Sequence, residues 1–429
     1  MLSTRRMLIA VGLGVLVAMT GCKTTEPTPP LEEPPNYSGE MAPGQKALVK
    51  LTDPSLFPDF SEGYDHQTGL EQAGYYSLEY LSKPSSQQYF PHLDITHARA
   101  VASVEALIDV LRSARSGQEL DAMIKERFDI YQSRGYPDTR TNPPSDSHIV
   151  LYTSYYRPIF DARMQPDHEF RYPLYRQPPD LTLNEDVGRY ERDGGGAYDT
   201  RSQIAHGILD SQGLELCYVR DRFEAYIITV QGSARLRMAD GTFFDIGYDA
   251  DNGHEYTSVG QRLVETGRID PMELSLQGLI RFFRENPDEL DAALAVNDRY
   301  VFFTPRGGGP FGSLNVPVTP YRSIATDNDV YPRAGVAFLQ TQIPGRSSDG
   351  TIRGYSYKGF AMDQDTGGAV RAAGRCDLFL GTGPEVGELA GRTFAEGKLY
   401  YIDVKENGPG SAEMASPEPE WQPDPEPGR

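Results

Sequence analysis

Two aspartates near the end of the chain are the side chains best suited to do chemistry. Asp365 and Asp377 stand in the segment MDQDTGGAVRAAGRCDLFLGTG, residues 362–383. The Thr-Gly-Gly after Asp365 indicates a strand that ends in a tight turn, because glycine tolerates positive φ. Asp377 leads into a second strand-like run that is closed by glycines. If both border one cleft, burial and mutual repulsion would raise one pKa, as a general acid requires. The alternative is that both aspartates only cap the turns of a β-hairpin.

Polar side chains at two other predicted strand ends could contact a ligand. The segment YTSYYRP places Thr153 and Tyr155 at the end of a strand, although a tyrosine-rich strand can also be simply amphipathic. In the segment FEAYIITVQGS, Gln231 and Ser233 flank a glycine at the end of another predicted strand. Glycine allows close approach of a ligand to the backbone, so this pair suits polar ligand contact.

Other kinds of catalytic site find little support in the sequence. His254 has no second histidine or carboxylate at metal-ligand spacing, so no metal or other cofactor is predicted. The glycine-rich segment 307–327 lacks the Gly-Lys-Ser/Thr of a phosphate loop. Cys217 and Cys376 make no disulfide framework, and no His-Cys arrangement supports Cys376 as a nucleophile. A Ser-His-Asp peptidase is equally unsupported.

The elements that must position these side chains are mostly strands. Short alternating runs bounded by Gly, Pro or Asp-Gly are typical of strands, and they are HIVLYTSYY, FEAYIITVQGS, RYVFFTP, GVAFLQTQIP and KLYYIDVK. Helices are expected at 96–116, at 117–133, and as two short helices within 273–297 that a proline separates. Ser258 or Thr257 should cap a further helix. The chain lacks βαβ alternation, which argues against a doubly wound parallel sheet.

Composition limits the kinds of partner. The 429 residues suffice for two domains, and a net charge of −20 argues against nucleic acid or an anionic membrane as an electrostatic partner. There are 26 Tyr and 18 Phe but a single Trp, Trp421. This aromatic content fits a β-rich fold with wet aromatic surfaces of the kind that bind sugars or peptides.

The N-terminus reads as a secretion signal. It has two arginines, an apolar run from Met7 to Met19, and then Thr-Gly-Cys, which is too short for a spanning helix. The residues before Cys22 resemble a bacterial lipobox, with Met19 in place of the usual leucine; the alternative is an ordinary signal peptide. A lipobox would make Cys22 the lipidated first residue of the mature chain. Because Lys23 follows rather than aspartate, we expect an outer-membrane lipoprotein that faces the periplasm of a Gram-negative bacterium.

The ordered series of motifs resembles the MltA family of membrane-bound lytic transglycosylases. In chain order the matching segments are YTSYYRPIFDARM, EFRYPLYRQPPD, ITVQGSARL, NGHEYTSVG, YVFFTP, GSLNVPVTPYRSIATD and DQDTGGAVRAAGRCDLFLGTGPEVGELAG. Two positions depart from the family pattern. Ser154 stands where a glycine is usual, and Ala234 ends what is usually Gln-Gly-Ser-Gly. Both changes exchange one small residue for another.

The resemblance implies a mainly β fold: a six-stranded double-psi β-barrel with a second, β-rich domain inserted into it, and few helices. The proline-rich composition near both ends adds a linker and an acidic tail. The expected parts are a lipoprotein signal peptide at 1–22, a linker at 23–48, the barrel at 49–157 plus 308–405, the inserted domain at 158–307, and the tail at 406–429.

The resemblance also implies an activity. The family cleaves the β-1,4 bond between N-acetylmuramic acid and N-acetylglucosamine in peptidoglycan, and leaves a 1,6-anhydromuramic acid end. The substrate's own C6 hydroxyl attacks, so a single acid/base residue can suffice. The family's catalytic position matches Asp377. The residues that would support the carboxylate or bind the glycan strand are Asp365, Thr153, Tyr155, Gln231 and Ser233. Participation in a cell-wall remodelling complex is left open.

Two other functions stay open on the sequence. A muramidase would hydrolyse the same bond with Asp365 as its second carboxylate, and would need the carboxyl groups roughly 6.5–9.5 Å apart to admit water. A peptidoglycan-binding outer-membrane lipoprotein without catalytic activity is also compatible, because a barrel fold alone does not determine function.

Overall fold

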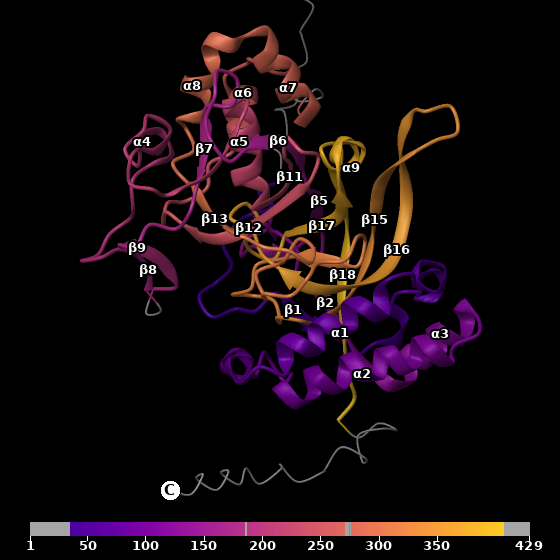
Figure 1. Ribbon diagram of the computed structural model, residues 1–429. Coiled ribbons are helices and arrows are strands. Elements are labelled where there is room, and N and C mark those ends of the chain that lie inside the picture. Colours follow the sequence, from indigo (N-terminus) through magenta and orange to yellow (C-terminus); the bar gives the residue numbers. More distant parts are fainter. Residues whose placement is uncertain (1–34, 185–186, 271–273, 275, 407–429) are drawn as a thin grey trace, which may run out of the picture. The chain divides into compact units, whose positions relative to one another are not determined.

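A computed structural model describes residues 35–184, 187–270, 274 and 276–406 (Figure 1). The predicted signal peptide with Cys22, the linker up to residue 34 and the tail from residue 407 lie outside the described residues. The described residues from Asn36 onward belong to one compact unit. Within this described part, no helix combines the length and hydropathy that a membrane span would need.

Six strands close into a barrel, which confirms the predicted fold class. In order around the barrel they are β18 (Ala395–Val404), β15 (Val336–Arg346), β16 (Ile352–Asp365), β14 (Ser323–Ala325), β17 (Arg375–Thr382) and β5 (Val150–Arg157). β5 pairs back with β18, which closes the ring. The β14–β16 and β17–β5 pairs are parallel, and the other pairs are antiparallel. β1 (Leu48–Lys50) and β2 (Phe128–Ser133) extend the sheet beside β18.

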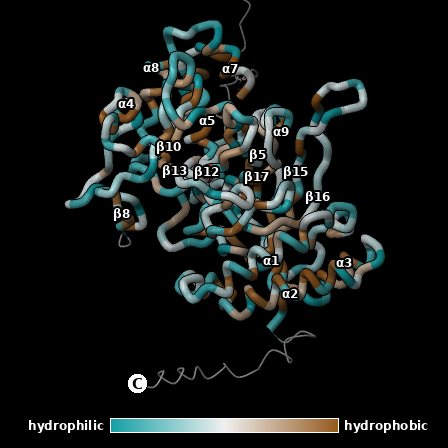
Figure 2. Tube along the Cα trace, in the orientation of Figure 1, coloured by the Kyte–Doolittle hydropathy of each residue, from teal (hydrophilic) through white to brown (hydrophobic). Residues whose placement is uncertain are grey.

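Three helices pack against the barrel: α1 (Leu70–Leu81), α2 (His97–Ser113) and α3 (Gly117–Arg127) (Figure 1). The Thr96 hydroxyl accepts the backbone N–H of Arg99 at 3.2 Å and so begins α2. Figure 2 shows hydrophobic residues along α2 and α3, mixed with hydrophilic ones, as amphipathic helices require. The predicted helix at 96–116 is confirmed. The predicted helix at 117–133 is confirmed over Gly117–Arg127, but its last six residues are strand β2, and α1 was not predicted.

A second sheet is built entirely from residues between β5 and β14. Its order is β13 (Val301–Pro305), β12 (Phe243–Asp251), β11 (Ser233–Arg237), β6 (Ile159–Arg163), β10 (Glu215–Val219) and β7 (Tyr172–Tyr175). Two small hairpins pair β3 (Pro137–Asp138) with β4 (Ser145–Asp146), and β8 (Leu181–Asn184) with β9 (Arg189–Arg192). The chain therefore leaves the barrel after β5 and returns to it after β13.

Short helices accompany the second sheet. They are α4 (Arg201–Ala205), α5 (Arg222–Gln231), α6 (Val259–Glu265), α7 (Leu276–Glu285) and α8 (Leu290–Leu294), whereas α9 (Pro384–Ala390) follows β17. Single 3₁₀ turns lie at Pro54–Leu56, Ser61–His66, Pro84–Tyr89 and Pro287–Glu289. The break at the proline between α7 and α8 is confirmed. Ser258 caps α6 as predicted, accepting the N–H of Gln261 at 3.2 Å.

The prediction of a strand at 223–233 is wrong, because this run forms helix α5. An Asp221 carboxylate oxygen accepts the N–H of Phe223 at 2.6 Å and caps the helix. Gly232, with φ of 71°, ends it in the left-handed region that glycine adopts without strain. Phe223 packs into a helical cluster while Ile228 packs into the core of the second sheet. Because α5 is buried on two sides, residues 225–230 are apolar apart from Thr229, and this run resembles a strand.

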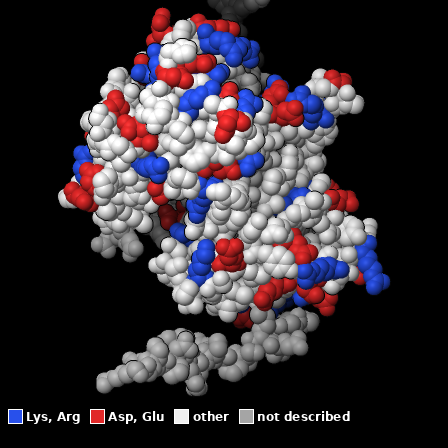
Figure 3. Space-filling view, viewed as in Figure 1, with Lys and Arg blue, Asp and Glu red and all other residues white. Residues whose placement is uncertain are grey.

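Residues 36–47, which the sequence assigns to the linker, pack against the barrel instead. The Tyr37 ring meets Tyr136 edge-on at 5.3 Å between centroids, and its hydroxyl donates to Glu396 at 2.6 Å. Ala47 is fully buried. On the face seen in Figure 3, acidic and basic side chains are interspersed rather than gathered by sign.

Candidate active site

Four neighbouring strands of the barrel bring three of the predicted residues, Asp365, Asp377 and Thr153, into one row. Asp365 ends β16 and Asp377 lies in β17; both are in register with Ala325 of β14, which runs between them. On the other side, Asp377 is in register with Thr153 of β5. Two interstrand spacings place the Cα atoms of the aspartates about 10 Å apart. The alternative of two caps on one hairpin is wrong, because β16 and β17 are not paired with each other.

Asp377 is partly buried and only weakly tied to its surroundings. Its Oδ1 is shielded from solvent and makes no hydrogen bond among the described residues. The pKa of Asp377 is raised to about 6, chiefly by burial and in smaller part by the charge of Asp365, against the opposing effects of Arg375 and the Thr153 hydroxyl. A carboxyl group with this pKa can both donate and accept a proton near neutral pH.

Asp365 is also partly buried, but backbone donors hold it in place. Its Oδ1 accepts the N–H groups of Ser313 and Thr366, both at 2.8 Å. A Cβ at Gly312 would lie 2.3 Å from the carbonyl oxygen of Gln364, so glycine is needed where the loop presents Ser313 to Asp365. Burial raises the pKa of Asp365 to about 6, against the effect of these hydrogen bonds. The two carboxylates are therefore not equivalent: backbone N–H groups hold the Oδ1 of Asp365, whereas the Oδ1 of Asp377 has no hydrogen bond among the described residues.

Tyr155, on β5, lines the cleft close to both carboxylates. Its ring is tilted against Phe379 with 5.2 Å between centroids. Its hydroxyl is shielded from solvent and makes no hydrogen bond of normal geometry among the described residues. Burial and the charges of Asp365 and Asp377 raise the pKa of Tyr155 well above its ordinary value. The hydroxyl therefore stays protonated and can act as a hydrogen-bond donor.

Arg375 belongs to the site, and the sequence prediction missed it. It lies two residues before Asp377 on β17, so both side chains leave the strand on the same face. Its Nη2 donates to the Thr153 hydroxyl at 3.3 Å, and its Nε makes no hydrogen bond among the described residues. Burial lowers the pKa of Arg375, and the Asp377 carboxylate opposes this shift. The alternation of strand residues was the signal that could have identified it.

A further carboxyl, Asp363, lies beneath the site and does not line the cleft. It is 1% exposed, and its Oδ2 accepts hydrogen bonds from Thr326 and Tyr401, both at 2.6 Å. Burial raises its pKa to about 7. Since its donors belong to the barrel interior, this group links β14, β16 and β18 rather than facing a ligand.

The two aspartates open into a cleft of about 740 Å³ lined by both sheets. Gln231 and Ser233 line it from the second sheet's side, and Tyr155 lines it from the barrel, whereas Thr153 lies behind Asp377 and does not. Gln231 accepts the backbone N–H of Tyr156 at 3.1 Å, which leaves its amide N–H groups available. The sequence prediction missed several aromatic and basic lining residues: Tyr190, Tyr248, Tyr256, Arg299, Arg306 and Phe311.

Metal and cysteine chemistry have no counterpart in the described part of the chain. No group of three or more His, Cys, Asp or Glu side chains there could hold a metal ion. Cys217 and Cys376 are both free and fully buried. Burial raises the pKa of Cys376 well above its ordinary value, so its thiol stays protonated.

Comparisons with known proteins place this geometry in context. Residues 151–304 match the model of the MltA-specific insert domain, and residues 322–403 match the 3D domain. The membrane-bound lytic murein transglycosylase A of Vibrio cholerae is 33% identical over 276 residues, which are 64% of this chain and 70% of that protein. The protein of the same name from Escherichia coli K12 is 30% identical over 273 residues, 62% of this chain and 68% of that protein.

Solved structures share the fold. A membrane-bound lytic murein transglycosylase from Agrobacterium tumefaciens superposes with a TM-score of 0.67 at 24% identity, over 83% of this chain and 98% of that one. MltA from E. coli with bound chitohexaose superposes with a TM-score of 0.59 at 22% identity, over 87% of this chain and 99% of that one.

Proposed function

This chain belongs to the MltA family of membrane-bound lytic murein transglycosylases, and from that premise we propose how it acts. It cleaves the β-1,4 bond between N-acetylmuramic acid and N-acetylglucosamine of peptidoglycan and leaves a 1,6-anhydromuramic acid end. The observation that carries the proposal is the inequality of the two carboxyl groups. Asp377 has an Oδ1 without a hydrogen bond, whereas Asp365 is held by two backbone N–H groups.

In the proposed reaction Asp377 first acts as an acid and then as a base. The protonated carboxyl donates its proton to the glycosidic oxygen as the bond from that oxygen to C1 breaks. The substrate's C6 hydroxyl then forms a bond to C1 and returns its proton to the Asp377 carboxylate, so the enzyme is unchanged and no water is consumed. Positioning makes this intramolecular attack efficient. The raised pKa of Asp377 supports both steps.

The contacts of the other site residues suggest a role for each of them. The fixed Asp365 and the protonated Tyr155 would hold the reacting sugar against Asp377 by hydrogen bonds. Thr153 would orient Asp377 from β5. Gln231 and Ser233, with the aromatic side chains of the cleft, would contact the glycan strand, as apolar faces with a few polar groups do in sugar sites. MltA of E. coli was solved with bound chitohexaose, a glycan. We also propose that the barrel at 49–157 plus 308–405 and the insert at 158–307 form the two walls.

A muramidase is the second candidate function. The Cα separation of about 10 Å is compatible with carboxyl groups far enough apart to admit a water molecule. In that reaction Asp365 would act as the base. The two backbone hydrogen bonds to Asp365 speak against this role, because they already occupy its Oδ1 and leave fewer lone pairs to take a proton from water.

Membrane association is part of the proposal, since the relatives are named membrane-bound. We propose that a lipidated Cys22 anchors the chain in the outer membrane, facing the periplasm, although Cys22 lies outside the described residues. The cleft would then face the peptidoglycan layer.

Product analysis tests the proposed function directly. The purified full-length chain in detergent is incubated with peptidoglycan sacculi, and the released muropeptides are identified by mass spectrometry. We expect anhydromuropeptides. Products with reducing ends would instead establish a hydrolase and give Asp365 the role of base. Binding to sacculi with no released product would leave a non-catalytic wall-binding lipoprotein.

The activity should decline above pH 6. Asp377 must be protonated to begin the reaction, and its pKa is raised from 3.8 to about 6. A rise in pH through 6 therefore removes the active form, and kcat/KM should fall about tenfold for each further pH unit. The rate of muropeptide release between pH 5 and 8 measures this, with sacculus binding followed over the same range as a control. A rate that rises with pH would contradict the acid role of Asp377.

A further inference from the structure

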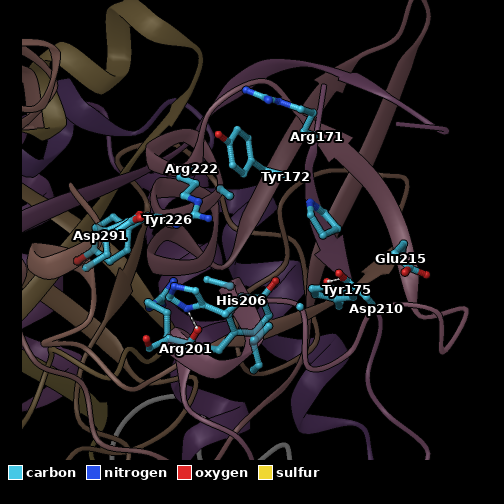
Figure 4. Close-up of a pocket in the computed structure, with 18 of the residues that line it drawn as sticks. Arg171, Tyr172, Tyr175, Arg201, His206, Asp210, Glu215, Arg222, Tyr226 and Asp291 are labelled. Atoms are coloured by element: carbon cyan, nitrogen blue, oxygen red, sulfur yellow. Dashed lines mark hydrogen bonds and ion pairs between the residues drawn. The ribbon is translucent and has the colours of Figure 1, made fainter. Parts of the chain in front are cut away.

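A second cavity, of about 630 Å³, opens in the inserted part of the chain (Figure 4). It is walled by β7, β10 and helices α4, α5 and α8, and none of the predicted site residues lines it. Arg201 is the one residue that lines both this cavity and the cleft. A cavity of this size is within the range that encloses small ligands.

Basic side chains stand over an aromatic ring on one side of the cavity. The guanidinium groups of Arg171 and Arg222 lie 5.8 and 5.6 Å from the centre of the Tyr172 ring. Arg222 is also paired with Asp291 at 2.5 Å. Arg171 makes no hydrogen bond or ion pair with any other residue in the described ranges. Its guanidinium is therefore available to an anion, with the ring supporting the charge.

Two carboxylates stand apart from these arginines, as Figure 4 shows. Asp210 accepts the hydroxyl proton of the buried Tyr175 at 2.8 Å, and Glu215 accepts the backbone N–H of Ser211 at 3.3 Å. Neither carboxylate has a basic partner among the residues that the structure covers. The cavity is open to solvent at Arg171 and Asp210, and it separates an arginine without an ion pair from two carboxylates that have no basic partner among the described residues.

The floor of the cavity holds one unsatisfied polar group. Arg201 is satisfied there, since it donates to the Thr229 hydroxyl at 2.8 Å and to the Asn297 carbonyl at 3.1 Å. The Tyr300 hydroxyl lies near the backbone of Tyr175 but makes no hydrogen bond of normal geometry in the described part of the chain. A buried polar group without a partner is typical of a site that a ligand or water completes.

We propose that this cavity binds a short peptide that carries both a free carboxylate and a free amine. Its carboxylate would pair with Arg171, and its amine with Asp210 and Glu215. The Tyr172 ring would pack on the apolar part of the peptide. A neutral glycan would not use separated charges of this kind. This identification rests on the proposed function: the ligand is the peptide branch of peptidoglycan. The cavity would bind that peptide while the cleft binds the glycan strand.

The test measures binding of the tripeptide N-acetyl-L-Ala-γ-D-Glu-meso-diaminopimelate, whose only free amine is on diaminopimelate as in the peptide branch, to the full-length chain by isothermal titration calorimetry. We expect Arg171→Ala to weaken binding by about tenfold or more, as loss of a charge-assisted hydrogen bond does. Arg176→Ala is the matched control, because Arg176 is exposed just beyond β7 and does not line the cavity. Acetylation of the diaminopimelate amine should also weaken binding, by removing the partner of Asp210 and Glu215.

Each outcome has a separate meaning. Equal tripeptide affinity in the Arg171→Ala variant and the unchanged chain would overturn the inference, as would a loss of chitohexaose affinity in that variant with no loss of tripeptide affinity. A chain that cleaves sacculi but does not bind the tripeptide keeps the proposed function and loses this site. A chain that binds the tripeptide through Arg171 but releases no muropeptide keeps the site and loses the proposed function.

Discussion

Replacing Asp377 with asparagine should lower kcat on sacculi by about 10²–10⁴-fold, the contribution of a positioned acid/base group. Asparagine has nearly the same shape but cannot donate the proton to the glycosidic oxygen or take it from the C6 hydroxyl. KM should change little, because the cleft keeps its lining. The measurement is the initial rate of anhydromuropeptide release at pH 5.5, where the unchanged chain is mostly protonated at Asp377.

The fold of the Asp377→Asn variant should be retained. Removing a partly buried carboxylate is favourable, but it also removes the attraction to the partly buried Arg375, so the two effects on the free energy of unfolding oppose each other. Asp349→Asn is the matched control, because Asp349 is an exposed aspartate in the loop between β15 and β16. Full activity in Asp377→Asn would show that another residue is the general acid, and Asp365 would be the first candidate to test.

Replacing Arg99 with alanine should lower the free energy of unfolding by about 3–5 kcal/mol, the typical cost of breaking a buried ion pair. Arg99, on α2, lies 2.8 Å from a carboxylate oxygen of Asp403 on β18, and their side chains are 9% and 4% exposed. Its Nε and Nη2 also donate to the Val404 carbonyl at 3.1 and 2.9 Å. The substitution leaves Asp403 buried without its cation and removes the hydrogen bonds of α2 to the Val404 carbonyl. Urea unfolding followed by circular dichroism measures the loss.

The pH dependence of this loss checks its cause. Burial already raises the pKa of Asp403 to about 6 even beside Arg99. Without Arg99 the group should bind a proton still more readily, so the destabilisation should be smaller at pH 5 than at pH 8. Arg112→Ala is the control on the same helix. Its ion pair with Glu71 is exposed, so the expected loss is much smaller than that of Arg99→Ala. Equal losses in the two variants would show that the buried pair carries no special stability.

Asp365 and Asp377 could be placed on strands from the sequence because the pattern that indicates each strand lies in the neighbouring residues. Asp365 stands directly before a Thr-Gly-Gly turn, and Asp377 stands in an alternating run, so both positions on strands follow from neighbouring residues. That they share a register with Ala325 could not be predicted this way. The register depends on β14, a strand of three residues whose placement is set by both of its neighbours.

The predictions that were wrong or missing depend on tertiary packing, which neighbouring residues do not reveal. Helix α5 is buried on two sides, which removes the polar face that reveals a helix in a sequence. Arg375 was overlooked because its role depends on burial beside Thr153, and burial is a property of the assembled barrel. The second cavity joins residues from Arg171 to Tyr300, and no single segment carries its pattern of charges.

The insertion between β5 and β14 also sets the order in which the molecule can be assembled. β5 is synthesised before the whole second sheet, but its partners β17 and β18 come only from residue 375 onward. Contacts between segments so distant in the sequence form slowly and late, whereas the second sheet has all its strands available earlier. Thr153 and Asp377 meet only when β17 is in place. A chain arrested on the ribosome before that strand therefore cannot cut glycan, whatever else has folded.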